Sequence, residues 1–292
     1  MKKIFLALFV ISASIAANAQ LLWKIDGNGA KQPSYIFGTH HLAPAALIDS
    51  VTGLKDAIKA SKIYYGEVDM NAFDLQKLQA LTMQKIYLPE DSTWSVIFTP
   101  QELALIDSIF PAQPPMPPTT KRLERVSPAF FDAQYAMQKA MQCLPDFDIN
   151  KQLDKTVFSI ANEQGLESRG FETNEFQLEV AYGAPLRQQA EALLADLRNP
   201  DADNEIKEMC DIYMRQDYPA LEIFTEKVRK GEVEQRAAER LIYSRNENWA
   251  NQLKDILPQG GIFIAVGARH LPGQRGLLNL LRQQGYSVNP VK

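Results

Sequence analysis

The chain has 292 residues, of which 46% are hydrophobic and 23% are charged, and its formal net charge is −4 at pH 7. This apolar content is enough to build the core of one large domain or two small ones. The acidic balance argues against nucleic acid as a partner, because nucleic-acid-binding domains carry an excess of basic residues.

The first 19 residues have the pattern of a secretory signal peptide. Two lysines precede the apolar run Ile4–Ile15, and the small-x-small triplet Ala17–Ala19 follows it. We predict cleavage near Ala19, which leaves residues 20–292 as the mature domain, secreted or in a bacterial periplasm. The apolar run is too short to span a membrane, and no later stretch reaches the roughly 18 apolar residues of a transmembrane helix. We therefore expect no integral membrane segment after signal removal.

The N-terminal part of the mature chain predicts strands that alternate with helix. Strands are expected over Leu21–Ile25, Tyr35–Gly38 and Lys62–Met70. Between the last two, Leu47–Ala60 has apolar residues at helical spacing and predicts one helix.

The middle of the chain predicts mostly helices. Thr99 is followed by a proline and then by Glu102, which is the pattern of a capping box at a helix start. Cys143 and Cys210 both lie in predicted helices, and a disulfide between them and two buried free thiols are both open. The helical pattern covers Phe73–Ile86, Thr99–Phe110, Ser127–Cys143, Asn150–Gln164, 174–197 and 203–257, and one strand covers Glu167–Glu172. Interruptions of the helical pattern are expected at Gly183, Asn199–Pro200 and Gly231.

The C-terminal segment repeats the order of the N-terminal one. A strand that begins at Ile262 runs into a Gly-x-x-His turn, followed by a helix over Gly276–Gln284 and a final strand over Tyr286–Val291. The two strand-GxxH-helix-strand units predict an internal repeat. Repeated units of strand and helix favour one α/β domain.

Both units carry the same motif, an apolar run followed by Gly-x-x-His-Leu. The motif occurs at Gly38–Leu42 and at Gly267–Leu271. Glycine lets a strand end turn sharply, and ligands bind at strand ends in open α/β sheets. We predict that His41 and His270 meet as metal ligands or as an acid–base pair; the alternative is two tight turns whose histidines bond only locally. His40 is either a third ligand or a bystander.

Two glutamates are expected at other strand ends. Glu67 follows Gly66, and Glu172 lies two residues after Gly170. Divalent ions bound by histidine usually take a carboxylate as well, so either glutamate is a candidate ligand or a general base. The alternative is that both side chains are solvated.

Arg245 and Asn246 form a polar pair in a predicted helix shortly before the second motif. An arginine at this place would bind a substrate carboxylate or phosphate, or stabilise a developing oxyanion. A solvated helix surface is the alternative.

The segments LLWKI, YIFGTHHL, YYGEVD, LESRGFETNEFQ, SRNENWANQL and AVGARHLPGQRGLLNLLRQQGYSV resemble the TraB/GumN family over essentially the whole mature chain. This family is similar to Tiki metalloproteases and to pheromone-shutdown proteins. The resemblance implies a single α/β domain with a mixed central sheet flanked by helices. It also implies a divalent-metal site (Mn, Co or Zn) at His41, His270 and Glu67. The catalytic set that it implies is Glu67, Glu172, Arg245 and Asn246.

Two functional hypotheses follow. The first is a secreted or periplasmic metal-dependent hydrolase, most simply a peptidase, in which the paired histidines and a glutamate activate water. The second is a non-catalytic protein that binds or sequesters a peptide or small ligand in the same cleft. The sequence contains no serine nucleophile elbow and no phosphate-binding loop, which argues against those two chemistries.

Overall fold

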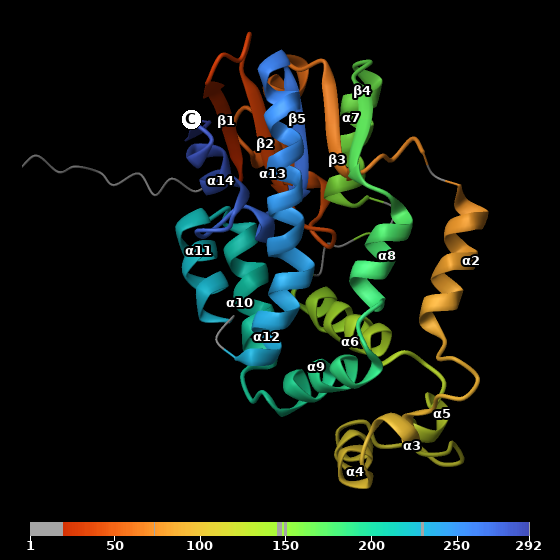
Figure 1. Ribbon diagram of the computed structural model, residues 1–292. Helices are drawn as coiled ribbons and strands as arrows, with labels where there is room; N and C mark the ends of the chain where they lie inside the picture. The colour runs from red at the N-terminus through yellow and green to blue at the C-terminus, as the bar shows by residue number, and fades with distance from the viewer. Residues whose placement is uncertain (1–19, 73, 145–147, 149–150, 229–230, 292) are drawn as a thin grey trace, which may run out of the picture.

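The computed structural model describes residues 20–291 except 73, 145–147, 149–150 and 229–230. The predicted signal peptide lies outside the described residues. A six-stranded sheet with strand order β4-β3-β5-β2-β1-β6 forms the centre of the molecule (Figure 1). The strands are β1 (Leu22–Gly27), β2 (Ser34–Thr39), β3 (Ile63–Val68), β4 (Glu167–Glu172), β5 (Ile262–Gly267) and β6 (Tyr286–Pro290).

The sheet is mixed, because β1 runs antiparallel to both of its neighbours, β2 and β6. The other neighbouring pairs, β2 with β5, β5 with β3, and β3 with β4, are parallel. Parallel strands end at the same edge of a sheet. The turns after β2, β3, β4 and β5 therefore leave the sheet at one common edge.

Helices cover both faces of the sheet. One face packs against η1 (Ala45–Ser50), α1 (Leu54–Lys59) and α7 (Leu153–Glu163), and the other packs against α13 (Ser244–Ile256) and α14 (Leu277–Gln283). The central strand β5 is apolar up to Gly267 and buried, as a strand covered on both faces requires. This arrangement confirms the predicted α/β fold with a mixed sheet flanked by helices.

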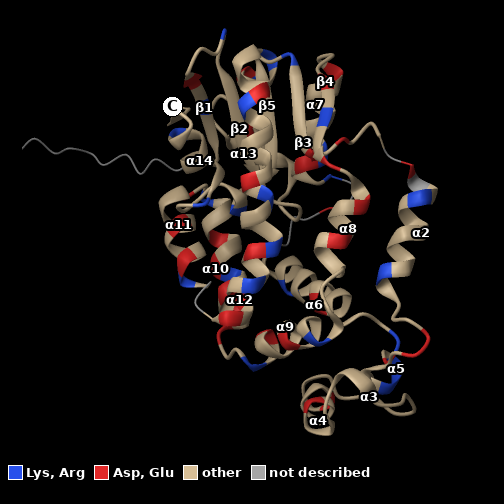
Figure 2. Cartoon of the chain, viewed as in Figure 1, with Lys and Arg blue, Asp and Glu red and all other residues tan. Residues whose placement is uncertain are grey.

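A helical region lies beyond the carboxyl edge of the sheet (Figure 1). Part of it has its own apolar core around Trp94, Phe98 and Ile106. Charged residues of both signs follow the helices of this region and α13 (Figure 2). Its elements are α2 (Leu75–Ile86), α3 (Trp94–Ile97), α4 (Pro100–Ile109), α5 (Thr119–Arg122), α6 (Pro128–Cys143), α8 (Asn174–Tyr182), α9 (Leu186–Arg198), α10 (Ala202–Met214), α11 (Tyr218–Lys227), α12 (Glu232–Ala238) and the π-helical turn η2 (Glu239–Tyr243).

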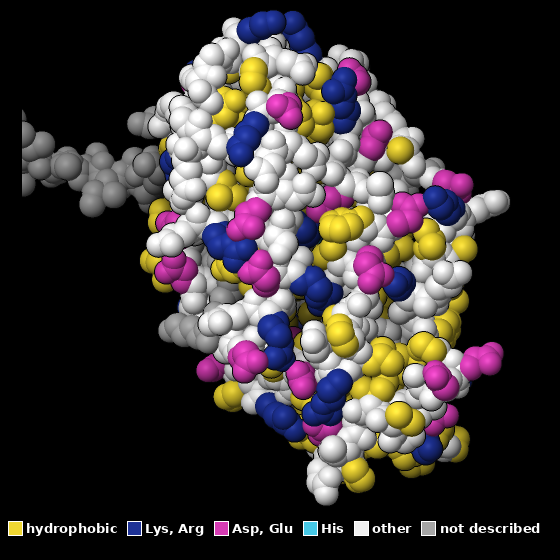
Figure 3. Space-filling view, viewed as in Figure 1, with side chains coloured by type: hydrophobic (Ala, Val, Ile, Leu, Met, Phe, Trp, Pro, Cys, Tyr) yellow, Lys and Arg dark blue, Asp and Glu magenta, His cyan; other side chains and the backbone are white. Residues whose placement is uncertain are grey.

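Several exposed apolar side chains gather on this helical region. Figure 3 shows hydrophobic side chains grouped over the part of the surface that includes α2 and α8. Met83 of α2 and Phe176 of α8 are 51% and 45% exposed, and Met141 of α6 is 43% exposed. None of the described helices is both long and apolar enough to cross a membrane.

All six predicted strands are present, and the capping box at Thr99 and Glu102 is confirmed with both of its hydrogen bonds. The single helix predicted over Leu47–Ala60 is wrong. It divides into a 3-10 helix and α1, because the chain is extended at Val51, after the 3-10 helix, and left-handed at Gly53 (φ 73°), the N-cap of α1. The predicted interruptions at Gly183 and Gly231 are confirmed, because Gly183 is the C-cap of α8 and Gly231 is the N-cap of α12. The helical pattern over 203–257 also breaks between α10 and α11, which was not predicted.

The two strand-GxxH-helix-strand units are arranged differently in the sheet. The first runs from β2 past β5 to β3, with α1 on one face, whereas the second runs from β5 past β2 and β1 to the edge strand β6, with α14 on the other face. Crossovers that move in opposite directions along a sheet place their helices on opposite faces when both are right-handed. The internal repeat is therefore not confirmed beyond the shared order of elements.

Candidate active site

Five of the predicted site residues meet at the carboxyl edge of the sheet, where β3, β4 and β5 end beside α13. The strand order explains the meeting, because Gly66 of β3 pairs with Ala265 of β5 and Val68 of β3 pairs with Glu172 of β4. The five residues are Glu67, Glu172, Arg245, Asn246 and His270.

Arg245 is at the centre of this group. Its Nε donates to the two carboxylate oxygens of Glu172 at 3.0 and 3.1 Å, and its Nη2 donates to Glu172 at 2.8 Å and to Glu67 Oε2 at 2.7 Å. The guanidinium also lies 4.6 Å from the ring centre of Trp249. The side chain is 9% exposed, so the solvated-surface alternative is wrong for Arg245.

The π-helical turn η2 immediately precedes the segment of α13 that carries Arg245 and Asn246. Such a turn contains one more residue than an α-helical turn and often occurs at functional sites. The Arg245 Nη1 donates to the carbonyl of Leu241 inside this turn at 3.0 Å, which helps to fix the direction of the side chain.

Asn246 fixes the orientation of the His270 ring. The Asn246 Nδ2 donates to the carbonyls of His270 and Arg275, at 3.1 and 2.8 Å, so its Oδ1 is left as the acceptor for His270 Nδ1 at 2.6 Å. His270 Nδ1 therefore carries a proton, and Nε2 lies 3.2 Å from Arg245 Nη1. Asn246 is 0% exposed, which excludes a solvated position for it as well.

Glu67 accepts hydrogen bonds on both oxygens. Its Oε1 accepts from the Gly267 backbone N–H at 2.8 Å, and its Oε2 accepts from Arg245 and from Gln177 Nε2, the latter at 3.0 Å. Burial alone would raise the pKa of this carboxyl group, but His270, Arg245 and the Gly267 N–H outweigh burial and lower the pKa to about 2. Glu67 is therefore ionised at neutral pH.

Glu172 lies deeper than Glu67 and is also not solvated. Its side chain is 2% exposed, and Oε1 accepts from Trp249 Nε1 at 2.9 Å in addition to Arg245. Both of its oxygens are thus bonded within the protein, and its main contact is with the guanidinium that reaches Glu67.

His41 lies at the exposed side of the site, with a side chain that is 71% exposed. Its Nδ1 donates to Asp154 Oδ2 at 2.8 Å, and this bond raises the pKa of His41. The charge of Glu67 also raises that pKa, so the ring is within electrostatic range of the buried group. Within the described residues, however, no group of three or more His, Cys, Asp or Glu side chains is placed to hold a metal ion.

His40 differs from His41 in its surroundings. Its Nδ1 accepts from the Leu42 backbone N–H at 3.2 Å, and its ring lies 5.1 Å from the ring of Tyr213. Burial lowers the pKa of His40 to about 4. The imidazole that pairs with a carboxylate in the first motif is thus that of His41.

Three groups of the site were not singled out in the sequence. Asp154 is in the first turn of α7, where an acidic residue has an ordinary structural role, so it gave no separate signal. Gln177, one turn into α8, is one of many glutamines in the chain, and the Gly267 N–H is a backbone group. Only the assembled sheet brings them to the glutamate and the histidines.

The motif glycines allow the two turns to pack closely. A Cβ on Gly38 would lie 2.8 Å from Leu271 Cδ1 and 3.0 Å from Ala268 Cα, so the first glycine makes room for the turn that carries His270. A Cβ on Gly267 would lie 3.3 Å from Glu67 Oε1, a tight contact that a small shift of the carboxylate relieves.

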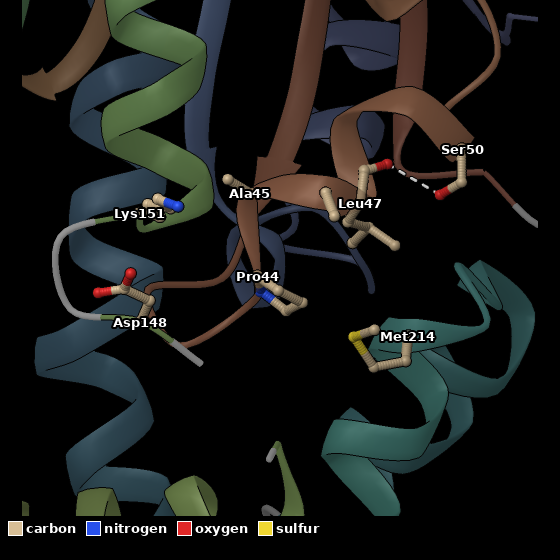
Figure 4. Close-up of a pocket in the computed structure, with 8 residues that line it drawn as sticks. Pro44, Ala45, Leu47, Ser50, Asp148, Lys151 and Met214 are labelled. Atoms are coloured by element: carbon tan, nitrogen blue, oxygen red, sulfur yellow. Dashed lines mark hydrogen bonds between the residues drawn. The ribbon is translucent and has the colours of Figure 1, made fainter. Parts of the chain in front are cut away.

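A cavity of about 410 Å³ lies beside the first motif, beginning three residues after His41 (Figure 4). Its wall includes Pro44, Leu47 and Met214, and Lys151 lies at its side. The segments on either side of the cavity are joined by hydrogen bonds from Ala45 N to Lys151 O and from Leu153 N to Ala43 O, at 3.2 and 3.1 Å. These same segments continue into His41 and Asp154.

Comparison with known proteins gives a family match over nearly the whole described chain. The model of the TraB/PrgY/gumN family matches residues 21–290. Over 66 residues the chain is 36% identical to "Metalloprotease TIKI1" of Homo sapiens, 33% identical to the same protein of Xenopus tropicalis and 35% identical to "Metalloprotease TIKI2" of Danio rerio. Each match covers 22% of this chain and 13% of the relative. No solved structure matches the chain significantly.

The donor atoms at the site suit a divalent ion in part. His270 Nε2 and Glu67 Oε1 are 3.8 Å apart, a separation that allows both to contact one ion at about 2.0–2.2 Å. In His41 and His270 the Nδ1 is bonded to a side-chain oxygen, which is the usual support for a histidine that binds a metal through Nε2. The types of donor atom therefore fit a divalent ion. The Nδ1 side of the His41 ring is turned toward Asp154.

Proposed function

The chain belongs to the TraB/PrgY/gumN family, and from this premise we propose that it is a metal-dependent hydrolase that cleaves peptides. The observation that carries the proposal is the group formed by His270, Glu67 and Arg245, in which an oriented imidazole, an ionised carboxylate and a guanidinium lie within hydrogen-bond or ion-pair distance of one another. The similarity to metalloproteases supports the choice of reaction, although it covers 22% of the chain.

In this proposal His270, Glu67 and His41 hold a divalent ion, Mn, Co or Zn. Such an ion, when bound, activates water and polarises a substrate carbonyl. The supporting observation is the matched environment of the two histidines, since Asp154 and Asn246 each accept a hydrogen bond from one Nδ1. Because those bonds use Nδ1, Nε2 is the nitrogen of each ring that would bind the ion; in His270 the same nitrogen lies 3.2 Å from Arg245 Nη1.

Arg245 orients the substrate and balances charge. Its guanidinium donates to both glutamates and is held by the Leu241 carbonyl and by the Trp249 ring. A group held this firmly does not have to reorganise as negative charge develops on a carbonyl oxygen. Glu172, whose oxygens are bonded to Arg245 and Trp249, acts in this proposal by positioning Arg245.

Glu67 is the carboxylate at the exposed side of the site, and its low pKa keeps it in the anionic form that would bind the ion. Its side chain is 17% exposed, compared with 2% for Glu172, so a substrate or a water molecule has easier access to Glu67. Gln177 and the Gly267 N–H fix the direction of its carboxylate. Asn246 keeps the imidazole of His270 turned toward it.

Apolar surface near the site supports peptides as the substrate class. Phe176, which is 45% exposed, is adjacent in sequence to the Gln177 that bonds Glu67. The cavity lined by Pro44, Leu47 and Met214 begins close to His41. Both surfaces are suited to bind apolar side chains of a peptide.

We further propose that the protein is exported, to a bacterial periplasm or outside the cell, with residues 1–19 removed. The basic start, the apolar run and the Ala17–Ala19 triplet support this proposal. Cell fractionation followed by N-terminal sequencing tests it. A protein that begins at Gln20 in the exported fraction is expected, and an intact N-terminus in the cytoplasmic fraction would refute export.

Metal analysis and peptide cleavage test the hydrolase proposal. The protein spanning residues 20–292 is reconstituted with Mn, Co or Zn, and its products from a peptide library are identified by mass spectrometry with and without a chelator. We expect a bound ion, chelator-sensitive cleavage, and loss of at least about 100-fold in rate for His41→Ala and His270→Ala.

His40→Ala is the matched control, because it removes an imidazole from the same turn without touching the Asp154 bond. It is expected to retain cleavage. Circular dichroism must show that all three variants are folded. Equal loss in all three folded variants, or cleavage that persists without any ion, would contradict the assigned roles.

A second candidate function is non-catalytic binding of a peptide or small ligand. The cavity beside Pro44 favours it, because this ligand-sized space of about 410 Å³ lies apart from the glutamates. Ligand binding that is unchanged in His41→Ala and His270→Ala, together with no cleavage by the reconstituted protein, would select this function over hydrolysis.

A further inference from the structure

The two cysteines of the chain lie next to each other across a pair of packed helices. Cys143 is the last residue of α6, and Cys210 is in the third turn of α10. Both belong to a small apolar cluster that includes Ala140 and Leu144 of the α6 segment and Ile206 of α10. Their sequence separation is about 70 residues, so only the packing of α6 on α10 brings them together.

The two thiols differ in their access to solvent. Cys210 is 2% exposed, whereas Cys143 is half-buried at the end of its helix. Burial, and after it the neighbouring Cys143 thiol with which it hydrogen-bonds, raises the pKa of Cys210 to about 11. An external reagent therefore reaches Cys143 first, and Cys210 has Cys143 as its nearest sulfur.

We propose that Cys143 and Cys210 form a redox site that a low-molecular-weight disulfide oxidises to an intramolecular disulfide between α6 and α10. This site is separate from the proposed hydrolysis and does not depend on it. The two thiols are near enough to hydrogen-bond, and they lie in one apolar cluster between packed helices, so their sulfur atoms are close, as a disulfide requires.

The reaction takes two thiol–disulfide exchanges. The Cys143 thiolate attacks one sulfur of the reagent, a mixed disulfide forms at Cys143, and one reagent thiol leaves. The Cys210 thiolate then attacks the Cys143 sulfur and releases the second reagent thiol. The protein dithiol loses two electrons and two protons, and the reagent disulfide is reduced to two thiols.

The disulfide would close a loop that contains part of the candidate active site. The residues between Cys143 and Cys210 include Asp154, Glu172 and Gln177. Leu42, which follows His41, packs against the cysteine cluster from the other side. The disulfide would restrict the unfolded chain and link α6 to α10 beside the first motif. The oxidised protein is therefore expected to be more stable than the reduced one.

The test uses reduced protein spanning residues 20–292 and oxidised glutathione. Samples taken over time are quenched with an alkylating agent and weighed by intact mass spectrometry. We expect a transient species with one glutathione and one alkyl group, followed by a species with neither, about 2 Da lighter than the reduced protein before alkylation, with one cross-linked peptide pair. The second step should accelerate about tenfold for each pH unit between pH 7 and 9, because the fraction of Cys210 thiolate rises with pH.

Two variants assign the order of events. Cys210→Ser is expected to stop at the adduct, and Cys143→Ser is expected to stay unmodified while it is folded. The oxidised protein should melt roughly 5 °C or more above the reduced one. An adduct on Cys143 that never closes in the folded protein at pH 9, or closure that occurs only in urea, would overturn the proposal.

Discussion

Asn246 offers a sharp test of the hydrogen bonds that hold the candidate active site together. Its side chain is 0% exposed and makes three hydrogen bonds, to the His270 ring and to the carbonyls of His270 and Arg275. The change Asn246→Ala removes all three and leaves the ring N–H and the His270 carbonyl buried without these partners.

The expected cost follows from the number and burial of these bonds. A buried polar group that loses its partner costs about 1–3 kcal/mol. With two deeply buried groups and a third beside the partly exposed Arg275, Asn246→Ala is expected to lower the free energy of unfolding by about 4 kcal/mol. That difference changes the ratio of folded to unfolded protein by roughly 1,000-fold.

Urea denaturation followed by tryptophan fluorescence and circular dichroism measures this loss. Asn251→Ala is the matched control, because Asn251 is on the same helix but is exposed and accepts a single hydrogen bond from Lys254. The control is expected to lose less than about 0.5 kcal/mol, as surface substitutions do. If the two variants lost the same free energy within error, the assignment of Asn246 as the buried support of His270 would be wrong.

Two further predictions concern the motif glycine and a carboxylate outside the site. Gly38→Ala is expected to destabilise the protein by about 1–3 kcal/mol, because the added Cβ meets the turn that carries His270. Gly267→Ala should cost less, because its Cβ makes one tight contact with a side chain that can move. Thermal unfolding compares the two variants, and equal losses of stability would contradict the packing described. Arg187→Gln removes the hydrogen bonds that, as the largest cause, lower the pKa of Glu102 from 4.5 to about 2. The lowered pKa of Glu102 stabilises the folded state above about pH 4.5, and this contribution is lost as pH falls through about 2. The difference in unfolding free energy between wild type and Arg187→Gln should therefore narrow from pH 7 to pH 2. A difference that does not change with pH would refute this role of Arg187.

The strands and both histidine turns could be predicted from local signals. Apolar runs that end at Gly38 and Gly267 are visible in the sequence, and so is the Thr99 cap. The break between Ser50 and Leu54 was missed because the apolar spacing continues across it. Interruptions marked by Gly183 and Gly231 could be predicted, because no apolar pattern continued across them.

The contacts of the site could be predicted only in part. The first turns of α13 are polar, which is the usual pattern of a solvated helix, and burial of Arg245 and Asn246 results from β4 and the second turn folding over them. The bond between His41 and Asp154 joins residues 113 positions apart and depends on the pairing of the segments around Pro44 and Gln152. Sheet order and such distant pairings are properties of the whole chain, which periodicity within a short window does not record.

The place of β5 in the sheet has a consequence for biosynthesis. This strand lies between β3 and β2, yet it is made from residues 262–267, close to the end of the chain. A nascent polypeptide that has not yet released these residues from the ribosome has two unpaired strand edges where its centre will be, and it lacks His270. The two parts of the sheet therefore join only after β5 has been made, and until then those edges need protection from pairing with other chains.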